Sequence, residues 1–569
     1  MHQDSDSLLT LNLDNNFQPK NNDSSKRSSI FSKGNRFFLF LFLLVFLAGF
    51  AIRIYRIGEM SLWWDELITG KYAQRVLETG MPLSPSGLVV YWRGAIYTYT
   101  VSLSMLIFGH NEFSVRLPSV VFGMIVSVIS FFFTYKMTKN KWIALCAMLF
   151  LSASPYNVEF SRFARFYIIN AGLFLISIWL FWIGFIQKNF KWKIVSTFIF
   201  ILMLHTVQLG AIYLSLFGVL FLRDIFLLIN RDHWRIDENR FQLKENILFF
   251  SLSVLIFFVG NFFELFWPNS FDEVTLASDY FGEAPSRSWS WLQWPNWNLI
   301  RFFHENYIPM YVTLLGFVLG CFDFIKAIRK REEISFGCYI TLVTVLSILL
   351  YEITSRGVIG ARIFLFAEAL IVIVTVATFY RALYLIKGKL LRTIMVYALM
   401  AMLGFNLFPQ VMQSVNRKYG DSVKKDAFRN TKVASFRPDN KTTYKFIRER
   451  KKPDEIWINL MNNNYFESGA VPDIVINENP KWYRNAVVGD DKGFYERSEL
   501  SKYISSTTDL EEYIHKNKSK GIWFTVNGQS VDLPYTKHID KLFDDFLEKN
   551  QDKIMYRSPD GISKVFFFN

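Results

Sequence analysis

Long apolar runs separated by short polar connections make up most of the chain between residues 37 and 411. An α-helix needs about 20 predominantly apolar residues to cross the hydrocarbon core of a bilayer. Windows of that length indicate spans at 37–54, 115–135, 142–157, 166–186, 194–206, 209–228, 246–265, 307–325, 334–352, 363–381 and 391–411. The pattern therefore predicts an α-helical polytopic membrane protein with about eleven transmembrane helices.

The pattern changes at both ends of this region. Residues 1–36 are polar and rich in Ser, Asn and Asp, and we expect a disordered tail. No small-residue cleavage site follows the first apolar run, so we interpret that run as an uncleaved span. Residues 412–569 are mixed in charge and carry β-type runs at 455–459 and 521–526. We therefore predict a tail, a membrane domain over 37–411 and a small external α/β domain.

Basic residues occupy every second connection between the predicted spans. They lie in the loops 136–141, 188–193, 223–245, 326–333 and 381–392. By the positive-inside rule these loops and the N-terminus are cytoplasmic, which puts the first loop, 55–114, and the C-terminal domain outside the plasma membrane. Within the first loop, 94–108 is apolar enough to resemble a span. Counting it would place Lys136 to Lys141 outside, so we expect a helix at the external interface.

Composition narrows the class of protein. Of 569 residues, 51% are hydrophobic, which is too apolar for a soluble assembly of this size. The net charge of +14 comes from clusters that flank the apolar runs, so we predict no nucleic-acid partner. The cysteines Cys146, Cys321 and Cys338 lack metal-ligand spacing, so neither a zinc site nor a disulfide framework is expected. P-loop and dinucleotide-binding patterns are missing from the sequence.

An acidic pair, Asp65-Glu66, stands behind two tryptophans shortly after the first predicted span. A carboxylate in such a semi-dry place can accept a proton from a sugar hydroxyl, and Trp64 can stack on a sugar ring. The residues also allow a plainer interpretation. The tryptophans would then anchor in the interface, and the acidic pair would cap a helix over Leu67 to Thr79.

Arginines recur in three of the predicted external loops. Arg93, beside Tyr91, suits a lipid phosphate or serves as a snorkelling anchor. Arg165 could hold a phosphate or an acceptor carboxylate, and Glu159 could pair with an arginine or assist the base. With Arg362 in a third loop, an anion site is favoured over unrelated anchors. Further candidate contacts for a sugar or an acceptor are Arg162, Tyr167 and His205.

Taken in order, these stretches resemble the GT-C superfamily of integral-membrane glycosyltransferases. The resemblance is to the group with protein O-mannosyltransferases, lipid A aminoarabinose transferases and rhizobial lipopolysaccharide sugar transferases. The resembling stretches are Trp64-Asp65-Glu66, 91–97, 108–119 and 161–167. The resemblance implies that Asp65 takes the place of the catalytic aspartate and that Arg93 matches a position that binds the carrier phosphate. It departs from many relatives at Phe163 or Arg165, where they carry an acidic residue, and at Gly94 to Tyr97, where Pro-Pro-Leu-Tyr is common.

The implied activity is transfer of a sugar from a polyprenyl-phosphate donor to a lipid, glycan or protein acceptor on the external face. A phosphate already leaves at neutral pH, so the chemistry needs a base, Asp65 with Glu66 beside it, and cations, supplied by Arg93, Arg165 and Arg362. We expect inversion by single displacement and no cofactor. A metal is not predicted, although Asp65 and Glu159 could hold one ion if they converge. The alternatives are a polymer ligase or polymerase that uses a diphosphate-linked oligosaccharide, and a non-enzymatic lipid or sugar transporter.

Overall fold

A computed structural model describes most of the helical region and parts of the C-terminal region. The described residues are 36–62, 64–83, 90–91, 94–206, 212–229, 236–266, 303, 308–330, 333–354, 365–386, 388–416, 439–460, 473–476, 486–488, 494–496, 502–504, 507–526, 546–559 and 563–569. The chain divides into two compact units, Met1–Val45 and Phe46–Asn569. The first contributes the start of one long helix, and the second holds every contact discussed below.

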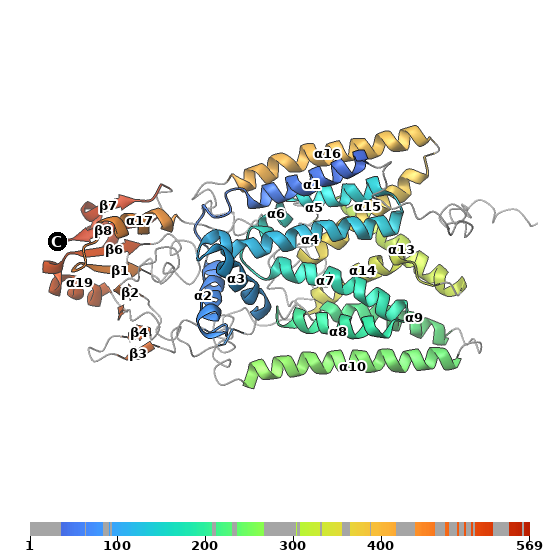
Figure 1. The fold of residues 1–569 in the computed structure, drawn as a ribbon, viewed down its shortest axis with the longest axis horizontal. Coiled ribbons are helices and arrows are strands. Elements are labelled where there is room, and N and C mark those ends of the chain that lie inside the picture. The colour runs from blue at the N-terminus through green and yellow to red at the C-terminus, as the bar shows by residue number, and fades with distance from the viewer. Residues whose placement is uncertain are drawn as a thin grey trace, which may run out of the picture. The chain divides into compact units, whose positions relative to one another are not determined.

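Helices fill the described chain as far as Val415 (Figure 1). They are α1 (Arg36–Ile54), α2 (Trp64–Thr79), α3 (Ala95–Phe108), α4 (Glu112–Thr138), α5 (Lys141–Ala153), α6 (Pro155–Ser161), α7 (Tyr167–Phe181), the π-helical turn η3 (Trp182–Ile186), α8 (Phe190–Leu204), α9 (Leu214–Ile229), α10 (Ile236–Phe266), α13 (Met310–Lys330), α14 (Phe336–Thr354), α15 (Leu365–Tyr384) and α16 (Lys389–Val415). Each of the eleven predicted spans overlaps a helix in this series.

Six of the described helical stretches are long and apolar enough to cross a membrane, and a bent pair makes up to seven. The six are Arg36–Ile54, Glu112–Thr138, Tyr167–Ile186, Met310–Lys330, Leu365–Tyr384 and Leu390–Pro409. Other predicted spans fall on shorter helices, such as α8 with 15 residues and α9 with 16. The predicted fold class, a helical polytopic membrane protein with a small C-terminal sheet, is confirmed.

One predicted span is interrupted. The run 142–157 forms α5, which ends at Ala153, and α6, which begins at Pro155, and the two axes differ by 60°. Proline lacks an N–H and clashes with the preceding turn, so it ends one helix and suits the first position of the next. The Ser154 side chain accepts a hydrogen bond from the Asn157 amide and caps α6. The prediction of one continuous span was therefore wrong here.

Two helices of the first loop do not run with the bundle. In Figure 1, α2 lies crosswise at one end of the long helices, with α3 packed against it. The Ser102 hydroxyl of α3 donates to the Ala73 carbonyl of α2 at 2.9 Å. The predicted interfacial segment 94–108 is helical over 14 residues and is too short to be a span. The predicted start of the preceding helix at Leu67 was late, because α2 already begins at Trp64.

The C-terminal region contains an eight-stranded mixed sheet with the order β3-β4-β5-β2-β1-β6-β8-β7. The strands are β1 (Ile456–Leu460), β2 (Ile474–Ile476), β3 (Ala486–Val488), β4 (Phe494–Glu496), β5 (Lys502–Ile504), β6 (Ile522–Val526), β7 (Ile554–Arg557) and β8 (Lys564–Phe568). Strand β1 pairs in parallel with β2 and β6, as crossover connections require. Two helices, α17 (Asn440–Arg450) and α19 (Thr507–Lys516), accompany the sheet. Side chains of α19, such as Leu510, bury the strand residues Ile458 and Phe524.

Candidate functional site

A buried ion pair fixes the start of α2 to α4. The Arg116 guanidinium grips the Glu66 carboxylate with both ends, Nε to Oε1 and Nη2 to Oε2, each at 2.8 Å. Neither side chain is more than 1% exposed. A two-point contact between an arginine and a carboxylate sets orientation as well as distance. The first turn of α2, in which Asp65 stands, is therefore held in a fixed orientation.

Arg116 also binds the chain segment that leads into α2. Its Nη1 donates to the carbonyl oxygens of Ile57 and Met60, and its Nη2 to that of Ser61, all at 2.8 Å. Together with the two contacts to Glu66, these bonds use all five N–H groups of the guanidinium. One buried side chain from α4 thus orders the whole turn between α1 and α2.

Arg162, predicted as a sugar or acceptor contact, is engaged at the end of α1. Its Nη1 lies 3.0, 2.9 and 2.6 Å from the carbonyl oxygens of Ile52, Arg53 and Tyr55. The last carbonyls of a helix have no partner within the helix, and a cation there also meets the negative end of the helix dipole. In this structure Arg162 anchors α1 from the second loop.

The first and second loops meet beside this ion pair. The Ala164 amide donates to Glu66 Oε1 at 2.9 Å, and Arg165 Nη1 donates to the Tyr91 hydroxyl at 3.3 Å. The Arg165 guanidinium also lies over the Phe166 ring, 4.9 Å from its centre. Two segments about 70 to 100 residues apart in sequence are thus brought within hydrogen-bond distance, with a partly buried cation between them.

The end of α8 reaches the same region. The His205 carbonyl accepts a hydrogen bond from the Ile96 amide at the start of α3, at 3.4 Å. Gly94, just before α3, has a φ of 97°, and a Cβ there would lie 3.0 Å from the Tyr91 ring and 3.1 Å from the Phe166 ring. Only glycine combines this backbone with such close packing. The residue that replaces the first proline of the common motif is therefore needed for the approach of the two loops.

The remaining predicted residues divide into two groups. Tyr167 opens α7 with its ring centre 5.8 Å from that of Phe160, and Glu159 stands half-buried on α6. The side chains of Trp64 and Asp65, and residues Arg93 and Arg362, lie outside the described part of the chain. No three His, Cys, Asp or Glu side chains gather as a metal site among the described residues.

A second buried polar cluster went unnoticed in the sequence. Arg53, Asn157 and Glu368, from α1, α6 and α15, are each 0% exposed. Asn157 contacts both charged side chains, at 2.8 Å and 3.4 Å. The available signal was a lone glutamate inside the predicted span 363–381, since a charge within a span needs a partner.

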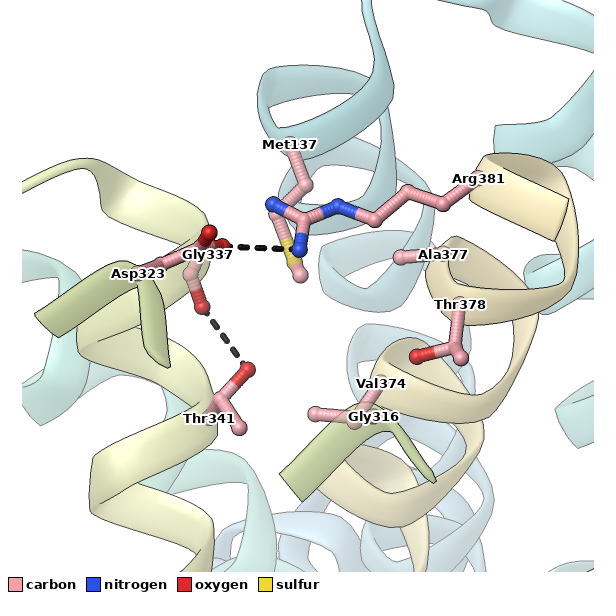
Figure 2. A pocket seen from close by; sticks show the side chains of 9 residues that line it. All are labelled: Met137, Gly316, Asp323, Gly337, Thr341, Val374, Ala377, Thr378 and Arg381. Carbon is pink, nitrogen blue, oxygen red and sulfur yellow. Dashed lines mark hydrogen bonds and ion pairs between the residues drawn. The ribbon is translucent and has the colours of Figure 1, made fainter. Parts of the chain in front are cut away.

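Figure 2 shows a small pocket lined by residues of α4, α13, α14 and α15. Met137, which lines it, follows Arg116 on α4 by 21 residues, which corresponds to about 30 Å of helix. The main polar groups in the pocket are Asp323 of α13 and Arg381 of α15, which pair at 2.7 Å. These charges neutralise each other, so we place the candidate site at the other end, where the loops converge.

Comparisons with known proteins identify the fold. Residues 93–261 match the family model described as "Dolichyl-phosphate-mannose-protein mannosyltransferase". The crystal structure of ArnT from Cupriavidus metallidurans in the apo state superposes with a TM-score of 0.51 and 13% identity, covering 94% of this chain and 98% of that one. The chain has the GT-C fold. The resemblance drawn from the sequence, to the GT-C superfamily, is thereby confirmed.

Two further matches show how far the likeness extends along the chain. ArnT from the same organism bound to undecaprenyl phosphate gives a TM-score of 0.50 at 12% identity, covering 93% of this chain and 98% of that one. An uncharacterised protein from Aquifex aeolicus is 28% identical over 126 residues, which is 22% of this chain and 25% of that relative. The match in sequence is thus local, whereas the GT-C fold extends over nearly the whole chain.

The GT-C family model covers most of the loop convergence. Its range includes Arg93, Arg116, Arg165 and His205, and begins after Asp65. The matched segment therefore contains Arg165 and Arg116, the second of which clamps Glu66. The acidic pair is contributed by the turn that the clamp holds in place.

Proposed function

We propose that this protein transfers a sugar from a polyprenyl-phosphate carrier to a lipid, glycan or protein acceptor on the external face of the plasma membrane. The observation that carries the proposal is the convergence of the first and second loops, with Ala164 on Glu66 and Arg165 on Tyr91. A cation held at the end of a membrane bundle suits a lipid-linked phosphate. ArnT, which shares the fold, has been crystallised with undecaprenyl phosphate.

Asp65 is the proposed general base. Both oxygens of Glu66 accept hydrogen bonds, from a guanidinium and from the Ala164 amide, and protonating that carboxylate would break its pairing with Arg116. The reaction needs a carboxylate able to receive a proton. Asp65, one residue earlier in the same fixed turn, is left for this role.

The proposed reaction is one displacement. The acceptor oxygen forms a bond to the anomeric carbon as the bond from that carbon to the carrier phosphate breaks, and the configuration inverts. The electron pair leaves with the phosphate, while the proton of the acceptor hydroxyl passes to Asp65. Arg165, together with Arg93 and Arg362, stabilises the charge that develops on the departing phosphate.

Mass spectrometry of surface glycans and lipids tests the proposal. We expect a strain lacking this chain to lose a single-sugar modification from one class of surface molecule and to accumulate the polyprenyl-phosphate sugar. The wild-type gene should restore the modification, and a gene encoding Asp65→Asn should not. Loss of a whole polymer instead would indicate the ligase or polymerase, and full restoration by Asp65→Asn would remove Asp65 from the proposed mechanism.

A further inference from the structure

A buried polar network lies where α5 breaks into α6, apart from the loop convergence. Its charged members are Arg53, near the end of α1, and Glu368, in the first turn of α15, and both are fully buried. Burying a charge without partners costs several kcal/mol, so such groups persist only when they are well coordinated. The coordination found here joins α1 and α15, which are distant in sequence, to the break between α5 and α6.

Two of the five hydrogen bonds from Arg53 go to carbonyl oxygens that the helix break exposes. Its guanidinium donates to the carbonyl oxygens of Leu151 and Ser152, in the last turn of α5, each at 3.0 Å. Those carbonyls lose their helical partners because α5 stops at Ala153. Further donations go to Gly49, to the Asn157 amide oxygen and to the Ser161 hydroxyl. All five N–H groups are used, and α6 is contacted near both of its ends.

Asn157 connects the two charges. Arg53 can only donate, so the oxygen of the Asn157 amide must face it, at 2.8 Å. The amide nitrogen then faces Glu368, whose Oε2 accepts at 3.4 Å. The orientation of this amide is therefore fixed by chemistry. The neutral Asn157 side chain therefore links the Arg53 cation of α1 to the Glu368 carboxylate of α15 through two hydrogen bonds.

Glu368 completes the cap of α6. Its Oε1 accepts a hydrogen bond of 2.5 Å from the Ser154 hydroxyl. The oxygen of that hydroxyl in turn accepts a hydrogen bond from the backbone N–H of Asn157 at the start of α6. A carboxylate in the first turn of α15 is also favoured by the positive end of that helix dipole. One glutamate thus holds Ser154 and Asn157, which determine where α6 begins.

We propose that Glu368 is a positioning residue that sets the orientation of α6 and, through it, of the turn that carries Arg165. Backbone hydrogen bonds continue from α6 into that turn. The Arg162 N–H donates to the Glu159 carbonyl at 3.0 Å, and the Arg165 N–H donates to the Phe163 carbonyl at 2.8 Å. The role in donor binding rests on the proposed function. The role in ordering α6 stands on the contacts alone.

Hydrogen exchange of the purified protein in lipid nanodiscs tests the ordering of α6. Glu368→Gln keeps the size of the side chain and removes its charge, so we expect amides between Val158 and Arg162 to exchange about tenfold faster or more. Asp323→Asn is the matched control, since it makes the same change in the ion pair at the other end of the bundle. Its α6 amides should exchange as in the wild type.

A milder variant guards against failure of Glu368→Gln to fold. Ser154→Ala removes one donor to Glu368 and the cap of α6, and the same amides should exchange faster, by a smaller factor. Wild-type exchange in folded Glu368→Gln, or in Ser154→Ala if only that variant folds, overturns the proposal.

Binding of undecaprenyl phosphate separates this inference from the proposed function. We expect the wild type and Asp323→Asn to bind it equally and Glu368→Gln to bind it about tenfold more weakly. Faster exchange in α6 with unchanged affinity would overturn the link to Arg165. If the wild type failed to bind any polyprenyl phosphate, the proposed function would fall while the ordering role of Glu368 would still be decided by exchange.

Discussion

At the scale of single residues, Asp65 and Glu66 are expected to respond differently to removal of their charge. Asp65→Asn should leave a folded protein whose transfer rate falls by at least about 10²–10⁴-fold, because the amide cannot accept the proton. Glu66→Gln should instead lower the free energy of unfolding by about 3–5 kcal/mol, because Arg116 loses a buried partner. Transfer assays and thermal unfolding of both purified variants measure the difference.

A role in capping α2 makes the opposite prediction for Asp65. Asparagine caps a helix about as well as aspartate, so near-normal transfer by Asp65→Asn would remove this residue from the mechanism. Loss of transfer in a stable Glu66→Gln variant would move the base by one residue.

The arginines are predicted to divide in the same way, into those that bind the donor and those that do not. Arg165→Ala and Arg93→Ala should weaken binding of undecaprenyl phosphate by roughly 10- to 100-fold, the value of a charge-assisted hydrogen bond of about 1.5–3 kcal/mol. Arg381→Ala, in the exposed ion pair at the other end, should leave the affinity unchanged. Equal affinity in all three variants and the wild type would show that Arg165 and Arg93 are anchors.

Candidate site residues could be identified from the sequence, but the side chains with which they pair could not. The acidic pair and Arg165 were recognised as candidates, but Glu66 is paired with an arginine 50 positions away. Glu368 was missed because its partners lie more than 200 residues earlier in the chain. Local patterns show that a buried charge needs partners, and only the packing of helices shows which ones.

At the scale of elements, hydrophobic length predicted the existence of the helices and missed their interruption. Every predicted span overlaps a helix, and the strands predicted at 455–459 and 521–526 are displaced by one residue at most. The break at Pro155 was overlooked because the apolar run 142–151 continues almost to this proline, and the predicted span ended only two residues beyond it. Hydropathy indicates whether a segment lies in lipid or in water. It does not show that a proline, which lacks an N–H and clashes with the preceding turn, divides the segment into two helices.

Close packing between α13 and α15 gives a test of the bundle. A Cβ on Gly316 would overlap the Thr378 hydroxyl and lie 2.9 Å from Val374, so Gly316→Ala should lower stability by about 1–3 kcal/mol. Adding Thr378→Ala should recover part of this loss. Gly337, on the rim of the same pocket, has room for a methyl group, with Met137 3.6 Å away, so Gly337→Ala is the control. Equal unfolding temperatures for Gly316→Ala and Gly337→Ala would contradict the packing.

At the scale of the whole molecule, the alternation of basic loops predicts its orientation in the membrane. Reporters fused after Lys139 or Lys191 should report the cytoplasm, and one fused after Asn569 should report the exterior. A reporter after Glu59, in the first loop, should agree with the C-terminal one. Finding both termini on the same side would overturn the count of eleven spans and would remove Asp65 from the external compartment.

The buried side chain of Arg53 also constrains how the protein is made. Arg53 leaves the ribosome 108 residues before Ser161, one of the groups that coordinate it, which is about 5 to 20 s of synthesis. During that interval α1 carries a guanidinium in its last turn without the carbonyl oxygens of α5. The first helix therefore cannot reach its final place until α5 and α6 have been inserted, and chains that stall before residue 151 should expose this charge to the quality-control machinery of the membrane.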